Sequence, residues 1–413
     1  MKIRPGLHRL VRQLSLNAHD RCTIATALAA LIRQRRRVLR LMAPALPLPL
    51  PASKRLLWGA MAAAIVRPNA APAHPQAVLA ALQRTQAWHQ ARIRERLRCS
   101  SPFGRGRNYR HLLQSWRQAR PDRLVIFHHY DPRGWLPRTW IGALSALRHA
   151  GWTVVVSTSG LQHQHHQALR AQDIQVAERR NQGLCLGAYK DLVLLLQHNP
   201  ALMAGLGSLV LCNDSTLPVG SVGQLIHQLE AWHQSGLATD QPRLAGLTDS
   251  VERGTYHLQS YLLHANAALL QSPFWLRFWL FFQPSGSKDD LIDRGELGLS
   301  QAALAGGAQL CPAYGLLDGL LACEAMVEEL KRHRITDPQQ INQTLFAWQS
   351  LLERGCPLVK KRVFFDGAEP EGQPLALHTI GHWLTPSVRA DLEWDLQQML
   401  ISRYTQQVPP QSP

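Results

Sequence analysis

Residues 174–215 read IQVAERRNQGLCLGAYKDLVLLLQHNPALMAGLGSLVLCNDS, and this stretch decides the fold. A short strand at residues 174–176 leads into a polar, glycine-bearing loop, an apolar segment of helical length and a buried strand at residues 209–212. The stretch ends on Asn213-Asp214-Ser215. Ligands of open α/β sheets bind beyond the carboxyl ends of the strands, so we expect Asp214 at a ligand site. A simple turn is the competing interpretation, because all three residues favour turns.

Strands and helices alternate on the N-terminal side of this stretch. The pattern predicts strands at residues 124–127 and 152–157, and helices at residues 136–149 and 167–172. This spacing is typical of an α/β fold with a mostly parallel, Rossmann-type sheet flanked by helices. The sequence has neither a Gly-x-Gly-x-x-Gly fingerprint nor a P-loop, so it does not support a dinucleotide oxidoreductase or a P-loop nucleotidase.

The length of 413 residues allows more than one domain, and a hydrophobic share of 46% is enough for a sizeable core. We expect a basic, helical, proline-interrupted arm at residues 1–122, an α/β domain at residues 123–366, and a C-terminal helix with a disordered tail at residues 367–413. The arm is interrupted at residues 44–51, where alternating prolines favour an extended chain.

The positive charge is concentrated in the predicted arm. Residues 1–122 hold 23 Lys and Arg against 3 Asp and Glu, a net charge of +20, whereas the remaining residues hold 22 against 25, a net charge of −3. Such asymmetry indicates a polyanionic partner, either a membrane surface or nucleic acid. Because the apolar residues 55–66 lie in the same arm, we expect it to bind an anionic membrane, and we do not expect nucleic acid as its partner.

The sequence favours a cytoplasmic protein that is held peripherally at the inner face of the membrane. No run of about 18 apolar residues occurs, so no membrane-spanning helix is predicted. No apolar core follows the basic N-terminus, which argues against a secretory signal. Seven scattered cysteines without CxxC spacing are typical of a reducing compartment and argue against a zinc ribbon.

A cluster of histidines at His163, His165 and His166 has the residue type of a metal site but lies in a glutamine-rich connection without a partnered cysteine. We therefore interpret it as a solvated loop. No Gly-x-Ser-x-Gly elbow occurs, so a serine hydrolase is not supported.

Two carboxylates carry the expected chemistry. A metal-holding Asp and a general base form a minimal set for sugar transfer with inversion, because the base removes the acceptor proton and the cation neutralises the leaving diphosphate. We predict that Asp214 binds the diphosphate through Mg²⁺ or Mn²⁺ and that Glu296 is the base, with Asp249 as its substitute. Glu296 follows Asp293-Arg294-Gly295, so a helix-cap carboxylate is the competing interpretation.

Polar residues around these carboxylates are candidates for binding substrate. On the donor side we expect Asn181 and Lys190, which offer amide groups and a positive charge, and Gly183, which lets the backbone approach closely. His129 and Asp131 directly follow the first predicted strand and are further donor candidates.

On the acceptor side we expect His257 and Gln259, which lie between Asp214 and Glu296 in the chain. A structural hydrogen-bonded pair remains the alternative for these two residues.

An ordered series of motifs across residues 123–365 resembles the rhamnan synthesis F family of glycosyltransferases, which act in bacterial cell-surface polysaccharide assembly. The series is Arg180-x2-Gly183 with Gly187-Ala-Tyr-Lys190, Asn213-Asp214-Ser215, Gly246-Leu-Thr-Asp249, His257-Leu-Gln-Ser-Tyr261, Glu296-Leu-Gly-Leu-Ser300 with Gly307, Asn342 with Trp348, and Gly355-x-Pro-x-Val-Lys360. The resemblance implies a GT-A-like fold, a nucleotide-sugar donor carrying rhamnose or another deoxysugar, and a lipid-linked or growing glycan as acceptor.

A second hypothesis comes from a different class of protein. In it the chain keeps the fold without catalysis and acts as a scaffold or a nucleic-acid-binding protein through its basic arm. The acidic positions favour the enzyme, whereas the charge of the arm fits both hypotheses.

Overall fold

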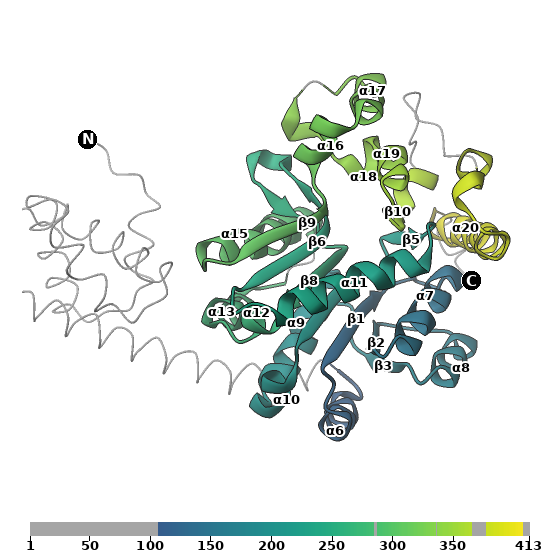
Figure 1. Ribbon diagram of the computed structural model, residues 1–413. Coiled ribbons are helices and arrows are strands. Elements are labelled where there is room, and N and C mark those ends of the chain that lie inside the picture. The colour runs from purple at the N-terminus through teal and green to yellow at the C-terminus, as the bar shows by residue number, and fades with distance from the viewer. Residues whose placement is uncertain (1–105, 285–286, 336, 366–376, 408–413) are drawn as a thin grey trace, which may run out of the picture. The chain divides into compact units, whose positions relative to one another are not determined.

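The computed structural model describes residues 106–284, 287–335, 337–365 and 377–407, except for the side chains of residues 377–379 and 402–407. Most of the predicted arm, residues 1–105, lies outside the described residues, as does the end of the predicted tail, residues 408–413. The described part is an α/β fold with a mixed, mostly parallel central sheet flanked by helices (Figure 1).

The central sheet of the described residues consists of β1 (Arg123–His129), β2 (Thr153–Thr158), β3 (Gln175–Glu178), β4 (Ser208–Asn213), β6 (Arg243–Ser250), β7 (His257–Leu258), β8 (Leu262–Asn266) and β9 (Gln309–Tyr314). The strand order is β3-β2-β1-β4-β8-β6-β7, with β9 paired to β6. Strands β1 to β4 pair in parallel, and β8 is antiparallel to both β4 and β6. The four strands predicted on β1 to β4 are confirmed, whereas the antiparallel insertion of β8 was not predicted.

The helices of the described residues are α6 (Tyr109–Ala119), α7 (Arg138–His149), α8 (His163–Ala171), α9 (Leu184–Gln197), α10 (Pro200–Gly205), α11 (Val222–Leu237), α12 (Ala267–Leu270), α13 (Pro273–Phe281), α14 (Lys288–Leu291), α15 (Gly298–Ala305), α16 (Leu316–Ala322), α17 (Glu324–Arg332), α18 (Gln343–Phe346), α19 (Trp348–Glu353) and α20 (Pro386–Gln407). Short 3₁₀ helices are η3 (Glu252–Gly254), η5 (Pro338–Gln340), η6 (Lys361–Phe364) and η7 (Leu377–Trp383), and η4 (Ile292–Leu297) is a π-helical turn. None of the helices in these ranges has both the length and the apolar composition needed to cross a bilayer.

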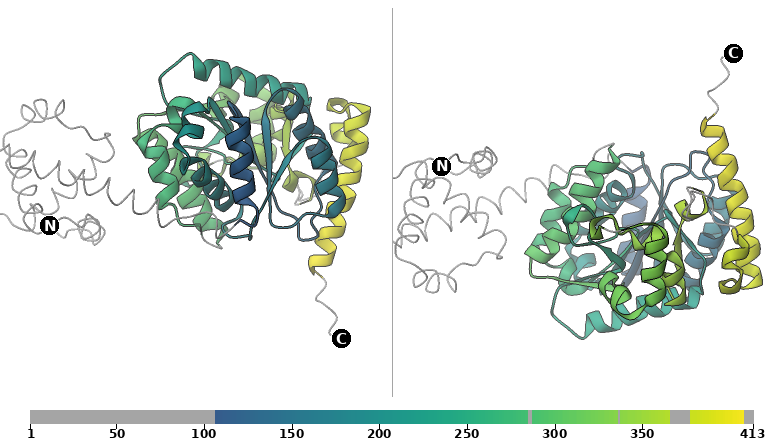
Figure 2. Two further views of the ribbon diagram at one scale, coloured as in Figure 1. Left: turned by 90° about the horizontal axis from the view of Figure 1, so that it is seen from below. Right: turned by 90° about the horizontal axis from the view of Figure 1, so that it is seen from above.

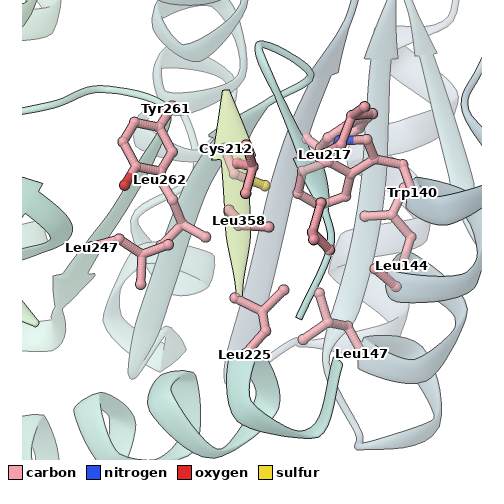
Figure 3. Close-up of a cluster of buried hydrophobic side chains, with 14 of the residues drawn as sticks. Trp140, Leu144, Leu147, Cys212, Leu217, Leu225, Leu247, Tyr261, Leu262 and Leu358 are labelled. Atoms are coloured by element: carbon pink, nitrogen blue, oxygen red, sulfur yellow. The ribbon is translucent and has the colours of Figure 1, made fainter. Parts of the chain in front are cut away.

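Successive side chains of a strand point to opposite faces of the sheet, and here both faces carry apolar side chains that helices cover. On one face, Phe127 of β1 packs against Trp140 of α7, with ring centroids 4.5 Å apart. The same cluster includes Cys212 of β4 and Leu225 of α11, and Figure 3 shows Trp140, Cys212 and Leu225 between the sheet and the helices. The opposite face is covered by α9, whose residues from Leu186 to Leu196 are all buried.

Helix α6 lies in the described part of the range predicted as the arm, and it packs against β3 and α9. The Trp116 side chain is fully buried, and its Nε1 donates a hydrogen bond of 2.9 Å to the Gln175 side chain. Residues 109–119 are therefore part of the α/β domain.

The histidine stretch that we predicted as a solvated loop is helical, and that prediction is wrong. His163, His165 and His166 all lie in α8. His165 is buried, with its ring edge-on to Trp135 at a centroid distance of 4.6 Å. Packing against this tryptophan accounts for a helix where the polar composition indicated a loop.

A second, two-stranded sheet pairs β5 (Thr216–Pro218) with β10 (Leu358–Lys360) in antiparallel orientation. The pairing places Lys360 opposite Thr216. Leu358 packs beside Leu217 and Cys212 in the main core (Figure 3). A segment late in the chain is thereby anchored directly beside the end of β4.

The N-terminus of α7 is capped by a residue of the C-terminal helix. Asp395 of α20 is fully buried and accepts hydrogen bonds from the backbone N–H groups of Arg138 and Thr139, at 2.7 and 2.9 Å. The residue preceding α7, Pro137, supplies no side-chain cap. Helix α20 lies along α7 (Figure 2) and satisfies donors that would otherwise be left unpaired.

We expect Asp395→Ala to lower the free energy of unfolding by about 2 kcal/mol, because it removes a helix cap and leaves buried N–H groups without acceptors. Gln397→Ala, on an exposed position of the same helix, is the matched control and should change it by less than about 0.5 kcal/mol. Urea unfolding followed by circular dichroism measures both values. Equal effects of the two substitutions would contradict the capping role.

Candidate functional site

The candidate site lies where β1 and β4 end side by side. Strand β1 pairs with β2 on one edge and with β4 on the other, so the strand order reverses at this point. In open α/β sheets, a crevice for ligands forms at the carboxyl ends of the strands where the order reverses. His128 and Asn213 are opposite each other in the register, and Asp214 follows directly.

Asp214 is a partly buried, ionised carboxylate. Its Oδ2 lies 3.0 Å from Nζ of Lys361 and accepts a longer hydrogen bond of 3.4 Å from the N–H of Tyr130. Burial raises the pKa of Asp214, but its interactions with Lys361 and with the neighbouring His129 and His128 outweigh burial and lower the pKa below the ordinary value. The predicted turn is also present, since Oδ1 of Asn213 accepts a hydrogen bond of 2.9 Å from the N–H of Ser215.

Lys360 approaches the same tip from β10. Its Nζ donates a hydrogen bond of 3.3 Å to the hydroxyl of Ser215 and lies 4.5 Å from the ring centroid of Tyr261. Burial lowers the pKa of Lys360, while the charge of Glu296 opposes that shift. Lys361 thus pairs with Asp214, and Lys360 feels the charge of Glu296, at this end of the sheet.

Glu296 lies in the π-helical turn η4, and such turns are frequent at functional sites. Its Oε2 accepts hydrogen bonds from the backbone N–H of Ser260, at 2.7 Å, and from the Ser260 hydroxyl. Burial raises the pKa of Glu296, but the contacts with His257 and Ser260 outweigh it and lower the pKa. The side chain keeps 18% exposure, so this held carboxylate can meet a substrate.

His257 supports Glu296 from behind. Its Nδ1–H donates to the carbonyl of Thr255 at 2.8 Å, which directs Nε2 to Oε1 of Glu296 at 3.6 Å. Burial lowers the pKa of His257, but Glu296 outweighs burial and raises it. With only 1% of the side chain exposed, His257 orients the carboxylate and is not placed to bind acceptor.

Gln259 and Asp249 belong to internal hydrogen-bond networks. The Gln259 side chain is buried and accepts from the Thr248 hydroxyl at 2.7 Å. Asp249 accepts from the backbone N–H of Leu316, at 2.6 Å, and from the Gln343 amide, at 3.1 Å. Asp249 therefore caps the start of α16, and burial raises its pKa. These contacts give both residues a structural role.

The predicted donor residues in the loop before α9 and in α9 itself do not lie together at one site. Asn181 is exposed. Gly183 has φ of +73°, and a Cβ at this position would lie 2.1 Å from Cβ of Pro284, so backbone conformation and packing require the glycine. Lys190 is buried, and its ammonium donates to the carbonyls of Leu280 and Phe282 at the end of α13. Lys190 thus satisfies a helix C-terminus, where cations are favoured.

The two candidates after β1 differ in accessibility. His129 is fully buried, with Nε2 bonded to the carbonyl of Trp135 at 2.7 Å. Burial lowers its pKa, which keeps it neutral. Asp131 accepts from the N–H groups of Arg133 and Trp135, at 2.8 and 3.1 Å, and lines a pocket of about 380 Å³. This pocket lies between residues 130–134 after β1 and residues 159–162 after β2.

Three further residues of the site were not identified from the sequence. Cys185, in the first turn of α9, has its pKa raised to about 12 by burial, with the charges of Glu296 and Asp214 adding to the effect. Glu252 accepts from the Asn342 amide at 3.0 Å, and burial together with the charge of Glu296 raises its pKa. Lys361 directly follows Lys360, the last residue of the motif series. A pair of lysines directly after a short apolar strand was the available signal.

The surroundings of Asp214 bear on the predicted divalent cation. Magnesium is commonly held by one or two carboxylates together with waters and substrate phosphates. Within the part of the chain that the structure describes, no group of three or more His, Cys, Asp or Glu is arranged to hold a metal. The ammonium of Lys361 is in direct contact with the one carboxylate that we predicted as the ligand.

No protein-family model matches the chain, and no curated protein matches it.

The stability that the His257–Glu296 pair contributes should depend on pH. The pKa of His257 is raised above 6.5, so its contribution is complete below that pH and is lost as the pH rises through the raised value. The pKa of Glu296 is lowered below 4.5, so its contribution is complete above that pH and is lost as the pH falls through the lowered value.

We therefore expect His257→Gln to be most destabilising between pH 4.5 and pH 6.5, by roughly 1.5–3 kcal/mol, and less so at higher pH. Urea unfolding inside and above this window measures the difference from the unaltered protein. His163→Gln, on an exposed position of α8, is the control and should show no such trend. A destabilisation by His257→Gln that grows above pH 6.5 would refute the pairing.

Proposed function

We propose that this protein is a glycosyltransferase that moves a sugar from a nucleotide-sugar donor to a lipid-linked or growing polysaccharide acceptor. The observation that carries the proposal is the group of charged side chains at the end of the sheet, where Lys361 contacts Asp214, Lys360 contacts Ser215, and Ser260 holds Glu296. The mixed, mostly parallel sheet is compatible with the GT-A-like fold that the motif resemblance implies. The resemblance also favours rhamnose or another deoxysugar as the transferred group.

The motifs behind the resemblance support the proposal because several of them meet at this site. Asn213-Asp214-Ser215 and Lys360 are joined by the contact between Lys360 and Ser215. Ser260, from the fourth motif of the series, holds Glu296, from the fifth. Residues far apart in the sequence thus form one cluster at the end of the sheet, where an α/β protein binds its ligand.

In the proposed reaction, Glu296 is the general base. The ionised carboxylate accepts the proton of the acceptor hydroxyl, whose oxygen attacks the anomeric carbon of the donor sugar. Ser260 and His257 hold the carboxylate in place, which keeps it oriented for proton transfer. On the donor side, the pocket beside Asp131 would accept the nucleoside.

A thermal-shift screen tests the choice of donor. At a concentration of 100 times its dissociation constant, a nucleotide sugar should stabilise the folded protein by about 2.7 kcal/mol. That stabilisation corresponds to a rise of several degrees in the melting temperature. Deoxysugar donors such as dTDP-rhamnose should give the largest shift. If no nucleotide sugar changes the melting temperature, the proposed function is wrong.

Turnover of a base variant tests the mechanism. Glu296→Gln should keep donor affinity while the transfer rate to a membrane glycan extract falls by at least about a hundredfold, the usual contribution of a positioned base. Glu328→Gln, on the surface of α17, is the matched control and should leave transfer unchanged. Near-normal transfer by Glu296→Gln would refute its role as base.

We further propose that the basic arm holds the enzyme on the anionic inner face of the membrane, which is where a lipid-linked acceptor would be. The support is the net charge of +20 in residues 1–122. Replacing Arg33, Arg35, Arg36, Arg37 and Arg40 with glutamine should weaken binding to phosphatidylserine vesicles, which sedimentation measures. Tighter binding to RNA than to vesicles at the same salt concentration would favour the nucleic-acid-binding alternative.

A further inference from the structure

The lysine pair at the end of β10 is fixed by backbone pairing. Lys360 is opposite Thr216 in the β5–β10 register, and the N–H of Lys361 donates a hydrogen bond of 2.9 Å to the carbonyl of Ser215. Both side chains therefore start from backbone positions that are tied to the tip of β4. A small shift of β10 would break these bonds, so the pair is placed before any ligand arrives.

Lys361 is in contact with Asp214. The Nζ–Oδ2 distance is 3.0 Å, and the side chains are 23% and 13% exposed. A divalent cation bound to this carboxylate would lie against the ammonium, and the two positive charges would repel each other. Lys361 therefore already supplies the positive charge that a metal on Asp214 would bring.

Lys360 adds a second positive charge, held at a defined position. Its Nζ is bonded to the Ser215 hydroxyl and lies over the ring of Tyr261, which restricts the flexible stem. The site therefore carries two ammonium groups for the charge of a diphosphate, with the base Glu296 on the acceptor side. Lysine is a common ligand of phosphate in proteins, where it acts as a point charge.

We propose that Lys360 and Lys361 bind the donor diphosphate directly, that Asp214 positions Lys361, and that donor binding needs no divalent cation. This inference rests on the proposed function. In the transfer, the bond between the anomeric carbon and the diphosphate oxygen breaks, and its electron pair stays on the diphosphate. The acceptor oxygen forms the new bond to the anomeric carbon, and its proton goes to Glu296. The lysines neutralise the charge that develops on the leaving diphosphate.

The test is calorimetric titration of the full-length protein with UDP, GDP and dTDP, in EDTA and in Mg²⁺. We expect at least one nucleoside diphosphate to bind with the same affinity in both buffers. Lys361→Gln and Lys360→Gln should each weaken that binding about ten- to hundredfold, the usual effect of losing a hydrogen bond to a charged group. Lys361→Arg keeps the charge and should retain most of the affinity.

Two further variants complete the design. Lys331→Gln removes a lysine from the surface of α17 and should leave affinity unchanged, which controls for the loss of one positive charge. Asp214→Asn should weaken binding equally in EDTA and in Mg²⁺, because its role is to hold Lys361. The basic arm is present in every variant, so differences between variants report on the site.

Two other outcomes of the titration would contradict the inference, and they differ in what they imply for the proposed function. Binding that requires Mg²⁺, is lost in Asp214→Asn and is unchanged in Lys361→Gln would overturn the inference and leave the proposed function standing. The absence of binding by any nucleoside diphosphate in either buffer would overturn the proposed function and this inference with it.

Discussion

The parallel pairing of β4 with β1 is the constraint on which the rest of the structure depends. All six residues of β4 are buried, and their register with β1 sets His128 opposite Asn213. On its other edge β4 pairs with the antiparallel β8, which connects the two parallel parts of the sheet. A register slip of one residue would move the apolar side chains of β4 to the wrong face. The position of Asp214 is therefore fixed by the packing of the core.

Much of the sheet could be predicted from local sequence because apolar runs such as residues 124–127 carry their own signal. The antiparallel course of β8 could not, since strand direction depends on which partner the chain returns to and leaves no periodic trace in the strand itself. The first turn of α8, at His163, was missed for a related reason, since only residues 167–172 were predicted as helix. The polar composition of that turn matched a loop, whereas His165 packs against Trp135 and Leu169 is buried.

The candidate site was harder to predict than the sheet, because the partners of its side chains come from distant parts of the chain. Position after a strand pointed to Asp214, and position at a probable helix start pointed to Glu296. Lys361 lies beside the first carboxylate, and Ser260 holds the second. Lys190 and Asp249 had the right residue types, but their partners are helix ends, to which the sequence gives no pointer. The charge that faces Asp214 comes from Lys361, and only the β5–β10 pairing brings the two together. Residue type alone does not distinguish a lysine that caps a helix from one that faces a ligand.

The late position of these partners in the chain has a consequence for synthesis. Lys361 is separated from Asp214 by 147 residues, and Asp395 is separated from Arg138 by 257. Loops of this length must close before either contact forms, and folding dominated by distant contacts is slow. On the ribosome, strands β1 to β4 emerge long before the residues that complete them. A chain released early, before residue 361, would keep the strands and lack the charged end of the sheet. The complete chain therefore differs from such incomplete products at the candidate site, whose charged partners are made late.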